Sequence, residues 1–582
     1  MRHSENDYKL KRIILDFSIK NTLFLIFSRR IYVKKLFIFL ALCITCNVWS
    51  QSWSPPVDLD SPPSSYVAEG VFPQIEVDAA GNAFAAWCST NGGNAVFAAR
   101  YDALAQSWGP TVQIGIGNAE NAILSVTSDG KAIVVWDRDS VIYYNSYVGG
   151  WRGEGAVDPL GGPSQIHARV GVNGNDRAIA VWATPAGPTG DTIRGGVYDF
   201  AANSWSNVDI TSTSPDFFVG QPEIAVSVSN STRAIAVWRY RDEVTNDFRI
   251  QYSVYTNAWS PVESIATSEA NQLVIPIVAI SNDGSTAIAN WAQTNLVFPF
   301  IDYYVMGSVY TGSWSAPIQL SPDQGHLTLS GGLGPEKGLP FYSIAFDESG
   351  DAVDVWSFVD ESLVTPEYII QARTFQSSAF SPAQNISGTN DFLPQIALDG
   401  SGNGWAVWNQ GSFFAPPINI LATPFTKSGN TWGISEIIST STFSALANVA
   451  TNALGNFFAD WVNFEAGGII QASSLIESPL PPTPSPVLPL PPTNFNGKIR
   501  KNKFINETQY ILKARWDASP SANVISYRIY KKGQVVEKVS ANSPLVFVAS
   551  FDSKKTSFKY KIVSVNSNNQ ESASIKLRIG KD

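Results

Sequence analysis

The sequence predicts an all-β protein whose largest part is an eight-bladed β-propeller. The composition supports this fold class, because 12% aromatic residues, 43 Gly and 35 Pro accompany only 15% charged residues, as is typical of short strands joined by turns. A phrase that ends in tryptophan also recurs eight times along the chain. A proline-rich segment then separates these repeats from a basic C-terminal region.

Each repeat predicts four strands. In the first repeat, PQIEVDAAGNAFAAW contains an apolar stretch, a turn and a second apolar stretch, which together predict a β-hairpin. A third stretch such as VFAARYD follows, and a fourth opens with an aromatic residue such as Trp108. Four strands per repeat are typical of a propeller blade. The hairpins end at Trp87, Trp136, Trp182, Trp238, Trp291, Trp356, Trp408 and Trp461.

The last repeat lacks its fourth strand before the chain becomes proline-rich. The N-terminal segment that begins Trp53-Ser54-Pro55 has the pattern of a fourth strand and precedes the first repeat. We expect this segment to complete the last blade and close the ring, which removes open sheet edges. The propeller is therefore expected over residues 51–478.

Charge is distributed unevenly along the chain. Residues 1–50 hold nine Lys or Arg against three Asp or Glu, residues 494–582 hold 17 against six, and the segment between them holds 14 against 40. Because phosphate contacts require basic side chains, the acidic middle segment is unsuited to binding nucleic acid, and no nucleic-acid partner is expected. The basic C-terminal region is instead a candidate for contact with an anionic surface.

The N-terminus is similar to a secretory signal peptide over residues 1–50. Basic residues at positions 29–35 precede an apolar run over 36–46, which is shorter than the roughly 20 residues of a membrane span. Val48 and Ser50 are small enough to precede a cleavage site before Gln51. We expect a secreted, periplasmic or cell-surface protein without a transmembrane span after cleavage. Retention of the segment as an anchor is the alternative.

The repeat pattern P-x-I-x-V-D-x-x-G-N-A-x-A-V-W, followed by W-S-x-P, resembles that of sialidase-like, Asp-box propellers of secreted bacterial proteins. The resemblance covers the whole ring and implies the propeller fold. However, the turn before the fourth strand reads YTGSW or YDFAANSW instead of S-x-D-x-G-x-x-W, and the nearest match to the Arg-Ile-Pro signature of sialidases is Arg249-Ile250-Gln251. The resemblance therefore implies the fold and not catalysis.

A linker and a second domain follow the repeats. Residues 479–493 read PLPPTPSPVLPLPPT, which favours a polyproline II spacer. Residues 494–582 resemble a fibronectin type III sandwich, with Trp516 on an early strand and SFKYKIVSVNSNNQESA as a late strand and turn. Phe558 stands where this family has the tyrosine of its tyrosine corner, and Tyr560 lies two residues further on.

Candidates for catalysis are few. A catalytic triad would need His167 or His326, which we expect in a first strand and in a Gly-rich loop, and Cys88 is expected to be a small buried hydrophobe. Asp354 and Asp460 interrupt apolar strands, so each must find a partner or have a raised pKa. No catalytic residue, metal or cofactor is assigned.

Two further patterns have structural interpretations that we favour over functional ones. The recurring Asp of the hairpin turns, as at Asp78, Asp129, Asp283, Asp347 and Asp399, would suit calcium, but the regular recurrence favours turn geometry. The regular row of tryptophans would suit stacking on sugars, but its fixed place in every repeat favours core packing.

The longest insertions predict the binding surface. They join second to third strands or one blade to the next, and both kinds of connection open on the same face of a propeller. Because function concentrates on loops held by rigid scaffolds, this face is the candidate site, although solubilising loops without a ligand are the alternative. The candidate ligand-binding residues are Tyr240, Asp242, Glu243, Phe298, Phe300, Asp302, Phe358, Asp360, Phe413 and Phe414.

These observations favour an exported, non-enzymatic recognition or adhesion protein whose loop face binds an extracellular protein or glycan. The alternatives are a carbohydrate-active hydrolase of sialidase-like ancestry and a structural component of the cell envelope. Three arginines that converge on the centre of the ring would favour the hydrolase, whereas basic residues spread over the blades would favour binding.

Overall fold

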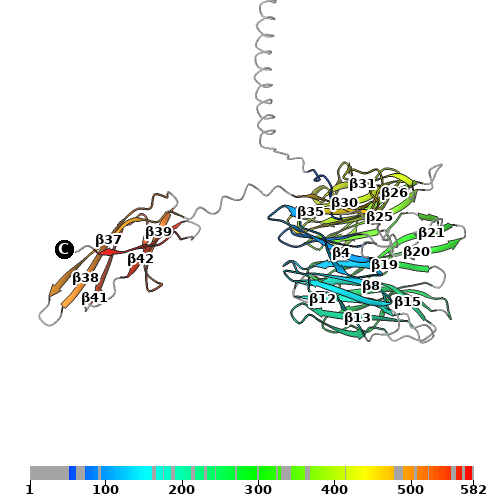
Figure 1. Cartoon of the computed structure of the whole chain (residues 1–582), viewed down its shortest axis with the longest axis horizontal. Helices are drawn as coiled ribbons and strands as arrows, with labels where there is room; N and C mark the ends of the chain where they lie inside the picture. Colours follow the sequence, from blue (N-terminus) through cyan, green and yellow to red (C-terminus); the bar gives the residue numbers. More distant parts are fainter. Residues whose placement is uncertain are drawn as a thin grey trace, which may run out of the picture. The chain divides into compact units, whose positions relative to one another are not determined.

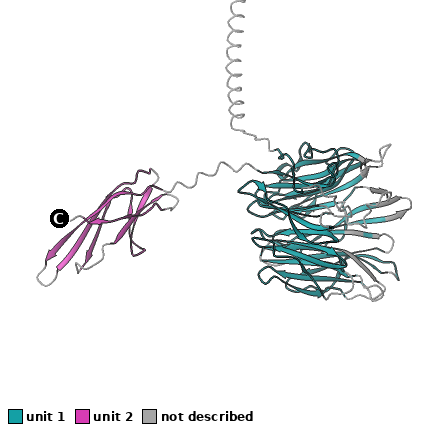
Figure 2. Ribbon diagram, viewed as in Figure 1, with its two compact units in different colours: residues 1–477 teal, residues 478–582 magenta. Residues whose placement is uncertain are grey.

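The computed structural model describes residues 52–579 apart from the segments 61–72, 90–92, 160–164, 175, 185–190, 212–216, 228–232, 243, 269–271, 298–299, 323–324, 329–341, 361–366, 413–414, 477–488, 504–507, 522–523, 552–558 and 567–570. The chain divides into two compact units, residues 1–477 (unit 1) and 478–582 (unit 2) (Figure 2). The predicted signal peptide and most of the predicted linker lie outside the described residues.

The described strands of unit 1 form eight antiparallel sheets of four or five strands (Figure 1). The first strands are β2 (Gln74–Val77), β7 (Ala119–Val126), β11 (Ile166–Val172), β15 (Phe217–Val226), β19 (Gln272–Ile280), β24 (Tyr342–Phe346), β29 (Asp391–Leu398) and β34 (Ser444–Thr451). The second strands are β3 (Ala83–Ser89), β8 (Ala132–Arg138), β12 (Arg177–Thr184), β16 (Ala234–Asp242), β20 (Ala287–Val297), β25 (Ala352–Asp360), β30 (Gly404–Ser412) and β35 (Phe457–Asn463).

The outer half of each sheet is formed by longer third strands and shorter fourth strands. The third strands are β4 (Ala95–Asp102), β9 (Val141–Tyr147), β13 (Thr192–Asp199), β17 (Phe248–Tyr255), β21 (Phe300–Tyr310), β26 (Glu367–Gln376), β31 (Ala415–Thr426) and β36 (Ile469–Leu475). The remaining strands are β1 (Val57–Asp58), β5 (Ser107–Trp108), β6 (Val112–Gly115), β10 (Gly155–Ala156), β14 (Ser204–Asp209), β18 (Glu263–Ser268), β22 (Ile318–Gln319), β23 (Gly325–Thr328), β27 (Ala379–Phe380), β28 (Gln384–Asn385), β32 (Thr431–Trp432) and β33 (Glu436–Ile437).

The sheets of unit 1 are arranged in a closed ring. Each first strand contacts the first strand of the next sheet, from β2 through β7, β11, β15, β19, β24, β29 and β34, and β34 contacts β2 again. A ring of radially arranged antiparallel sheets is a β-propeller, in which the first strands surround the axis.

The repeated tryptophans lie in the core between neighbouring sheets. All eight have at most 1% of their surface exposed, which confirms the prediction that they pack in the core. Three of them also donate an indole hydrogen bond to a glutamine of the third strand, for example from Trp356 Nε1 to Gln371 Oε1 over 3.0 Å. Burial of a large ring at the same position of every repeat stabilises the contact from each sheet to the next.

In some sheets the fourth strand begins beyond the tryptophan at which the sequence pattern predicts its start. Trp259 and Trp314 form only isolated bridges to the third strands, and Pro261 follows Trp259 closely in the W-S-x-P pattern. A proline has no N–H for the strand ladder, so pairing is interrupted there. Ser260, which lies between Trp259 and Pro261, replaces part of the lost strand pairing, because its Oγ accepts a hydrogen bond from the Val254 amide over 3.0 Å.

The sheet of the last repeat receives its outer strand from the N-terminal segment. Strand β1 pairs antiparallel with β36, so that Val57 lies opposite Ala472. The Leu59 amide donates to the Ile470 carbonyl over 2.8 Å, and the Ser54 amide donates to the Ser474 carbonyl over 2.8 Å. Residues more than 400 positions apart in sequence therefore share one sheet.

Unit 2 consists of two four-stranded sheets. The first pairs in the order β41 (Val546–Phe551), β38 (Thr508–Asp517), β37 (Thr493–Lys503) and β44 (Arg578–Ile579), and the second in the order β40 (Gln534–Ser540), β39 (Val524–Lys531), β42 (Tyr560–Asn566) and β43 (Ile575–Lys576).

The core of unit 2 includes Trp516 and Tyr560, which is 3% exposed. Phe558 lies outside the described residues. A different tyrosine makes a hydroxyl-to-backbone contact, because Tyr527 Oη accepts a hydrogen bond from the Ser519 amide over 2.9 Å.

Candidate functional site

The loops that join second to third strands, together with those that join one sheet to the next, open on one side of the ring, which we call the loop face. Of the predicted ligand-binding residues, the structure describes the side chains of Tyr240, Asp242 and Phe358. It places Phe300, Asp302 and Asp360 in strands β21 and β25 by their backbone. The predicted residues that lie outside the described part of the chain are Glu243, Phe298, Phe413 and Phe414.

Tyr240 lies at the loop-face end of the β16–β17 hairpin, where two arginines contact two aromatic rings. The register sets Tyr240 opposite Arg249, whose guanidinium lies 5.4 Å from the centre of the tyrosine ring. The guanidinium of Arg241 lies 5.5 Å from the ring centre of Phe248. Cation–π contacts of this kind hold arginine heads over aromatic faces. No sequence pattern marks these two arginines as part of a candidate site.

Asp242 organises the turn of the same hairpin. Its Oδ1 accepts hydrogen bonds from the amides of Val244, over 2.9 Å, and Thr245, over 3.0 Å. These amide donors, that of Thr245 first, lower the pKa of Asp242 below its usual range. The turn presents Val244, whose surface is 75% exposed. Asp242 is thus committed to the shape of the loop, and its neighbours form the exposed surface.

Phe358 is buried, which corrects the expectation that it contributes to the exposed loop face. Its surface is 6% exposed, and it packs in a cluster with Trp356 and Tyr303. Strand β25 continues past Trp356 to Asp360, so strand alternation places Phe358 on the same covered side of the sheet as Trp356. The sequence pattern predicts a loop at this position because it follows the repeated tryptophan.

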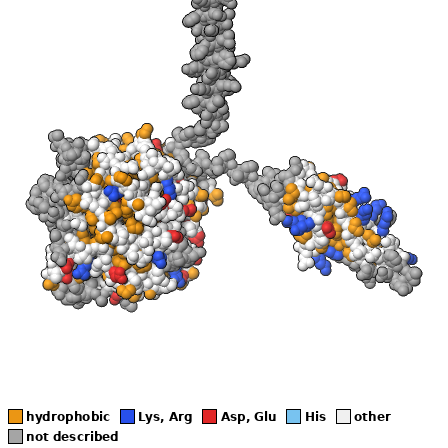
Figure 3. Space-filling view, turned by 180° about the vertical axis from the view of Figure 1, so that it is seen from behind, with side chains coloured by type: hydrophobic (Ala, Val, Ile, Leu, Met, Phe, Trp, Pro, Cys, Tyr) orange, Lys and Arg blue, Asp and Glu red, His pale blue; other side chains and the backbone are white. Residues whose placement is uncertain are grey.

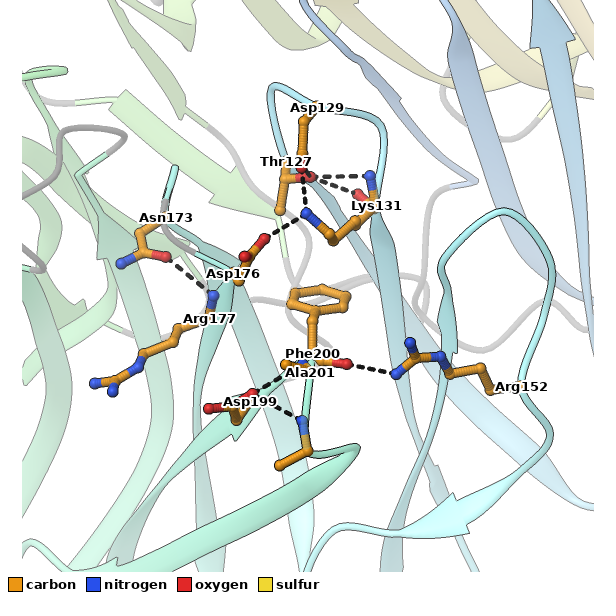
Figure 4. A network of polar contacts seen from close by, with 11 residues as sticks. Thr127, Asp129, Lys131, Arg152, Asn173, Asp176, Arg177, Asp199, Phe200 and Ala201 are labelled. Carbon is orange, nitrogen blue, oxygen red and sulfur yellow. Dashed lines mark hydrogen bonds and ion pairs between the residues drawn. The ribbon is translucent and has the colours of Figure 1, made fainter.

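The opposite side of the ring, the hairpin face, carries the short turns between first and second strands and between third and fourth strands. Its polar side chains bind one another across neighbouring sheets (Figure 4). Lys131 pairs with Asp129 of its own turn and with Asp176 of the next sheet's turn. Arg152 donates to the Phe200 carbonyl over 2.5 Å. These groups are therefore engaged within the protein.

The recurring aspartates of these turns also bind their own loops. Asp78 Oδ1 accepts hydrogen bonds from the amides of Ala80, over 2.9 Å, and Asn82, over 2.8 Å. The same contact recurs at Asp283 with the Ser285 amide, at Asp347 with the Ser349 amide and at Asp399 with the Ser401 amide, over 2.9, 2.8 and 2.8 Å. These contacts confirm the turn interpretation at these four positions. Among the described residues, no group of three or more His, Cys, Asp and Glu is placed to hold a metal ion.

The two carboxylates that interrupt apolar strands are both buried. Asp354 accepts a hydrogen bond from Asn290 Nδ2 of the preceding sheet over 2.7 Å, and burial raises the pKa of Asp354 to about 7 despite this donor. Arg373 lies opposite Asp354 on the neighbouring strand. Asp460 is fully buried, its oxygens have no hydrogen-bond partner among the described residues, and burial raises its pKa well above the usual range.

A bulge in several first strands creates a second set of contacts between sheets. The bulge residues Asn121, His167, Leu393 and Leu446 all have a positive φ, of 55°, 57°, 55° and 62° in that order. The freed amide of His167 donates to Asp137 Oδ2 over 3.0 Å, and the Leu393 amide donates to Ser357 Oγ over 3.0 Å. Both acceptors directly follow a repeated tryptophan. Burial raises the pKa of Asp137 to about 6.

The described residues contain few groups suited to catalysis. Cys88 is 8% exposed, and burial raises the pKa of its thiol to about 12, in agreement with the prediction of a buried hydrophobe. Burial lowers the pKa of His167 to about 4. His326 lies on strand β23 instead of in a loop, opposite Asp302 of β21. Of the described first-strand residues, Arg169 is the one arginine, and it pairs with Glu223 over 2.8 Å.

Comparison with known proteins gives only distant structural likenesses. No family model and no curated protein sequence matches the chain. Among solved structures, the WD40 domain of SCAP from fission yeast is 8% identical, with 72% of this chain and 94% of that chain covered at a TM-score of 0.38. A polysaccharide lyase of family PL25, an ulvan lyase, is 7% identical, with coverage of 62% and 93% and a TM-score of 0.38. The NanB sialidase of Streptococcus pneumoniae is 9% identical, with 71% of each chain covered and a TM-score of 0.28. The propeller assignment therefore rests on the strand pairing and ring contacts of this chain.

Proposed function

We propose that the protein is an exported, non-enzymatic recognition protein, in which an eight-bladed propeller binds an extracellular protein or glycan through its loop face. Its eight sheets are the blades, and β1 completes the last of them. Export follows from the resemblance of residues 1–50 to a signal peptide. Among the described residues, no helix is long and apolar enough to cross a membrane.

Two arginine–aromatic pairs at the loop-face end of β16 and β17 carry this proposal. On the hairpin face, turn carboxylates and basic side chains bind one another and the backbone, as at Lys131 and Asp176. At the loop-face end of β16 and β17, the exposed Val244 lies on a turn held by Asp242, next to two arginine–aromatic pairs. Arginine and aromatic groups with an exposed aliphatic side chain on a rigid hairpin are typical of recognition surfaces.

We further propose that unit 2 is a fibronectin type III-like domain. Strands β37, β38 and β41 make one sheet and β39, β40, β42 and β43 the other, as in the three-plus-four division of that fold. The final strand β44 departs from this division by pairing in parallel with β37. A domain of this kind serves to space or anchor the propeller.

The hydrolase alternative is supported by one feature, the register that sets Asp302 opposite His326 at the loop-face end of the fifth sheet. A hydrolase would turn over a glycan, whereas a recognition protein would bind it unchanged. Incubation of candidate glycans with the predicted mature chain, residues 51–582, followed by product analysis, therefore separates the two functions.

The binding proposal is tested by screening the predicted mature chain against a glycan array and in pull-downs from extracellular fractions. The Val244→Asp variant changes the exposed turn of the loop face. Leu104→Asp is the matched control, because Leu104 is 97% exposed on the β4–β5 turn of the hairpin face. We expect Val244→Asp to lose the detected partner and Leu104→Asp to retain it. Equal binding by both variants would contradict a loop-face site at this hairpin.

A further inference from the structure

A basic groove lies on unit 2, outside the propeller and its loop face. The groove has a volume of about 830 Å³, and its lining includes Lys532, Lys559 and Lys561. Its floor is formed by residues of β39 and β42, where the register sets Tyr530 opposite Lys561. Its rim is formed on one side by the β39–β40 turn and on the other by Ser572 and Ser574.

Among the described residues, Glu571 is the one carboxylate that lines the groove, and its charge is balanced by an arginine. Glu571 accepts hydrogen bonds from Arg528 Nη1 over 2.6 Å and from Tyr530 Oη over 2.6 Å. These contacts lower the pKa of Glu571 below its usual range, so it stays ionised and paired. The groove therefore keeps an excess of positive charge.

The three lysines of the groove have no ion pair with a carboxylate of the described residues. Lys532, Lys559 and Lys561 are exposed, whereas the nearby Arg528 forms an ion pair with Glu571. Lys559 and Lys561 flank the buried Tyr560, so strand alternation points both toward the groove, about 7 Å apart along the strand. A fourth lysine of the lining, Lys531, is held over the rings of Phe551 and Tyr560 at 4.9 and 5.1 Å.

We propose that this groove binds an anionic polysaccharide, a glycan chain that carries carboxylate or sulfate groups. Spaced lysine ammonium groups match the repeated charges of such a chain, and the tyrosine ring and serine hydroxyls of the lining offer contacts to sugar rings and hydroxyls. The concave shape favours a single chain over a flat membrane, because a bilayer surface reaches the rim more easily than the floor. Lysine and arginine side chains outnumber acidic ones on the visible face of unit 2 (Figure 3).

The test measures binding of polygalacturonate to the predicted mature chain, with neutral dextran of similar length as the uncharged control. Lys559→Gln combined with Lys561→Gln removes two charges from the groove. Lys501→Gln combined with Lys513→Gln is the matched control, because it removes two exposed lysines from the other sheet of unit 2. All four side chains are exposed, so the fold should persist, and circular dichroism checks this.

We expect the groove variant to bind polygalacturonate about tenfold more weakly, the loss expected for two exposed ion pairs, and the control variant to bind within about twofold of the unchanged chain. Binding should also weaken as salt screens the charges. An equal loss in both variants would show attraction by net charge alone and overturn the proposal. Stronger binding to phosphatidylglycerol vesicles or to duplex DNA than to polygalacturonate would overturn it in favour of a membrane or a nucleic acid. These binding measurements do not depend on whether the loop face of the propeller has a partner.

Discussion

Closure of the ring by the N-terminal segment can be tested at a single side chain, Trp53. This residue precedes β1, is 9% exposed and meets Trp405 of the neighbouring sheet edge to face, with ring centres 5.6 Å apart. Truncation of a buried tryptophan to alanine typically costs about 3–5 kcal/mol, because both transfer free energy and packing are lost. We expect Trp53→Ala to lower the stability of unit 1 by about this amount.

The same strand supplies the control. Val57 is 46% exposed, so Val57→Ala should change the free energy of unfolding by less than about 1 kcal/mol. Urea unfolding followed by circular dichroism measures both variants. Hydrogen exchange in β36, the strand that pairs with β1, should accelerate in Trp53→Ala and stay slow in Val57→Ala. Equal stability and equal exchange in the two variants would refute closure through a packed N-terminal strand.

Three further predictions follow from buried groups. The folded-state pKa of Asp354 is raised to about 7, so its contribution to the stability of the protein falls as pH rises from about 4 to 7. Asp354→Asn should therefore stabilise the protein at pH 8 by a few kcal/mol and reduce the pH dependence of stability measured in urea melts. A steeper pH dependence in this variant would contradict the prediction. Phe358→Ser should lower the melting temperature markedly, as expected of a core residue, whereas Val244→Ser should leave it unchanged. Cys88, with a pKa of about 12, should resist iodoacetamide at pH 8 in the folded chain and react in urea; rapid labelling of the folded chain would count against its burial.

The repeat and its core can be predicted from local sequence pattern alone. Eight tryptophans at one place in the repeat predict eight hairpins, and the structure buries each ring between sheets, because a large apolar ring has no other favourable environment. The carboxylates at Asp354 and Asp460 were also visible as interruptions of apolar strands, and burial raises the pKa of both. The tryptophans and the carboxylates are recognisable because each depends on the order of neighbouring residues in the sequence.

Which side chains meet across sheets depends on the folded structure. The donor for Asp354 is Asn290 of another repeat, and the acceptor for the bulged His167 amide is Asp137 of the preceding sheet, so neither pair has a signal in sequence spacing. The length of β25 likewise decided that Phe358 is buried, since the point where a strand ends depends on the partners it pairs with. The groove of unit 2 arises in the same way, because Lys532, Lys561 and Glu571 come from separate strands and loops that only folding brings together.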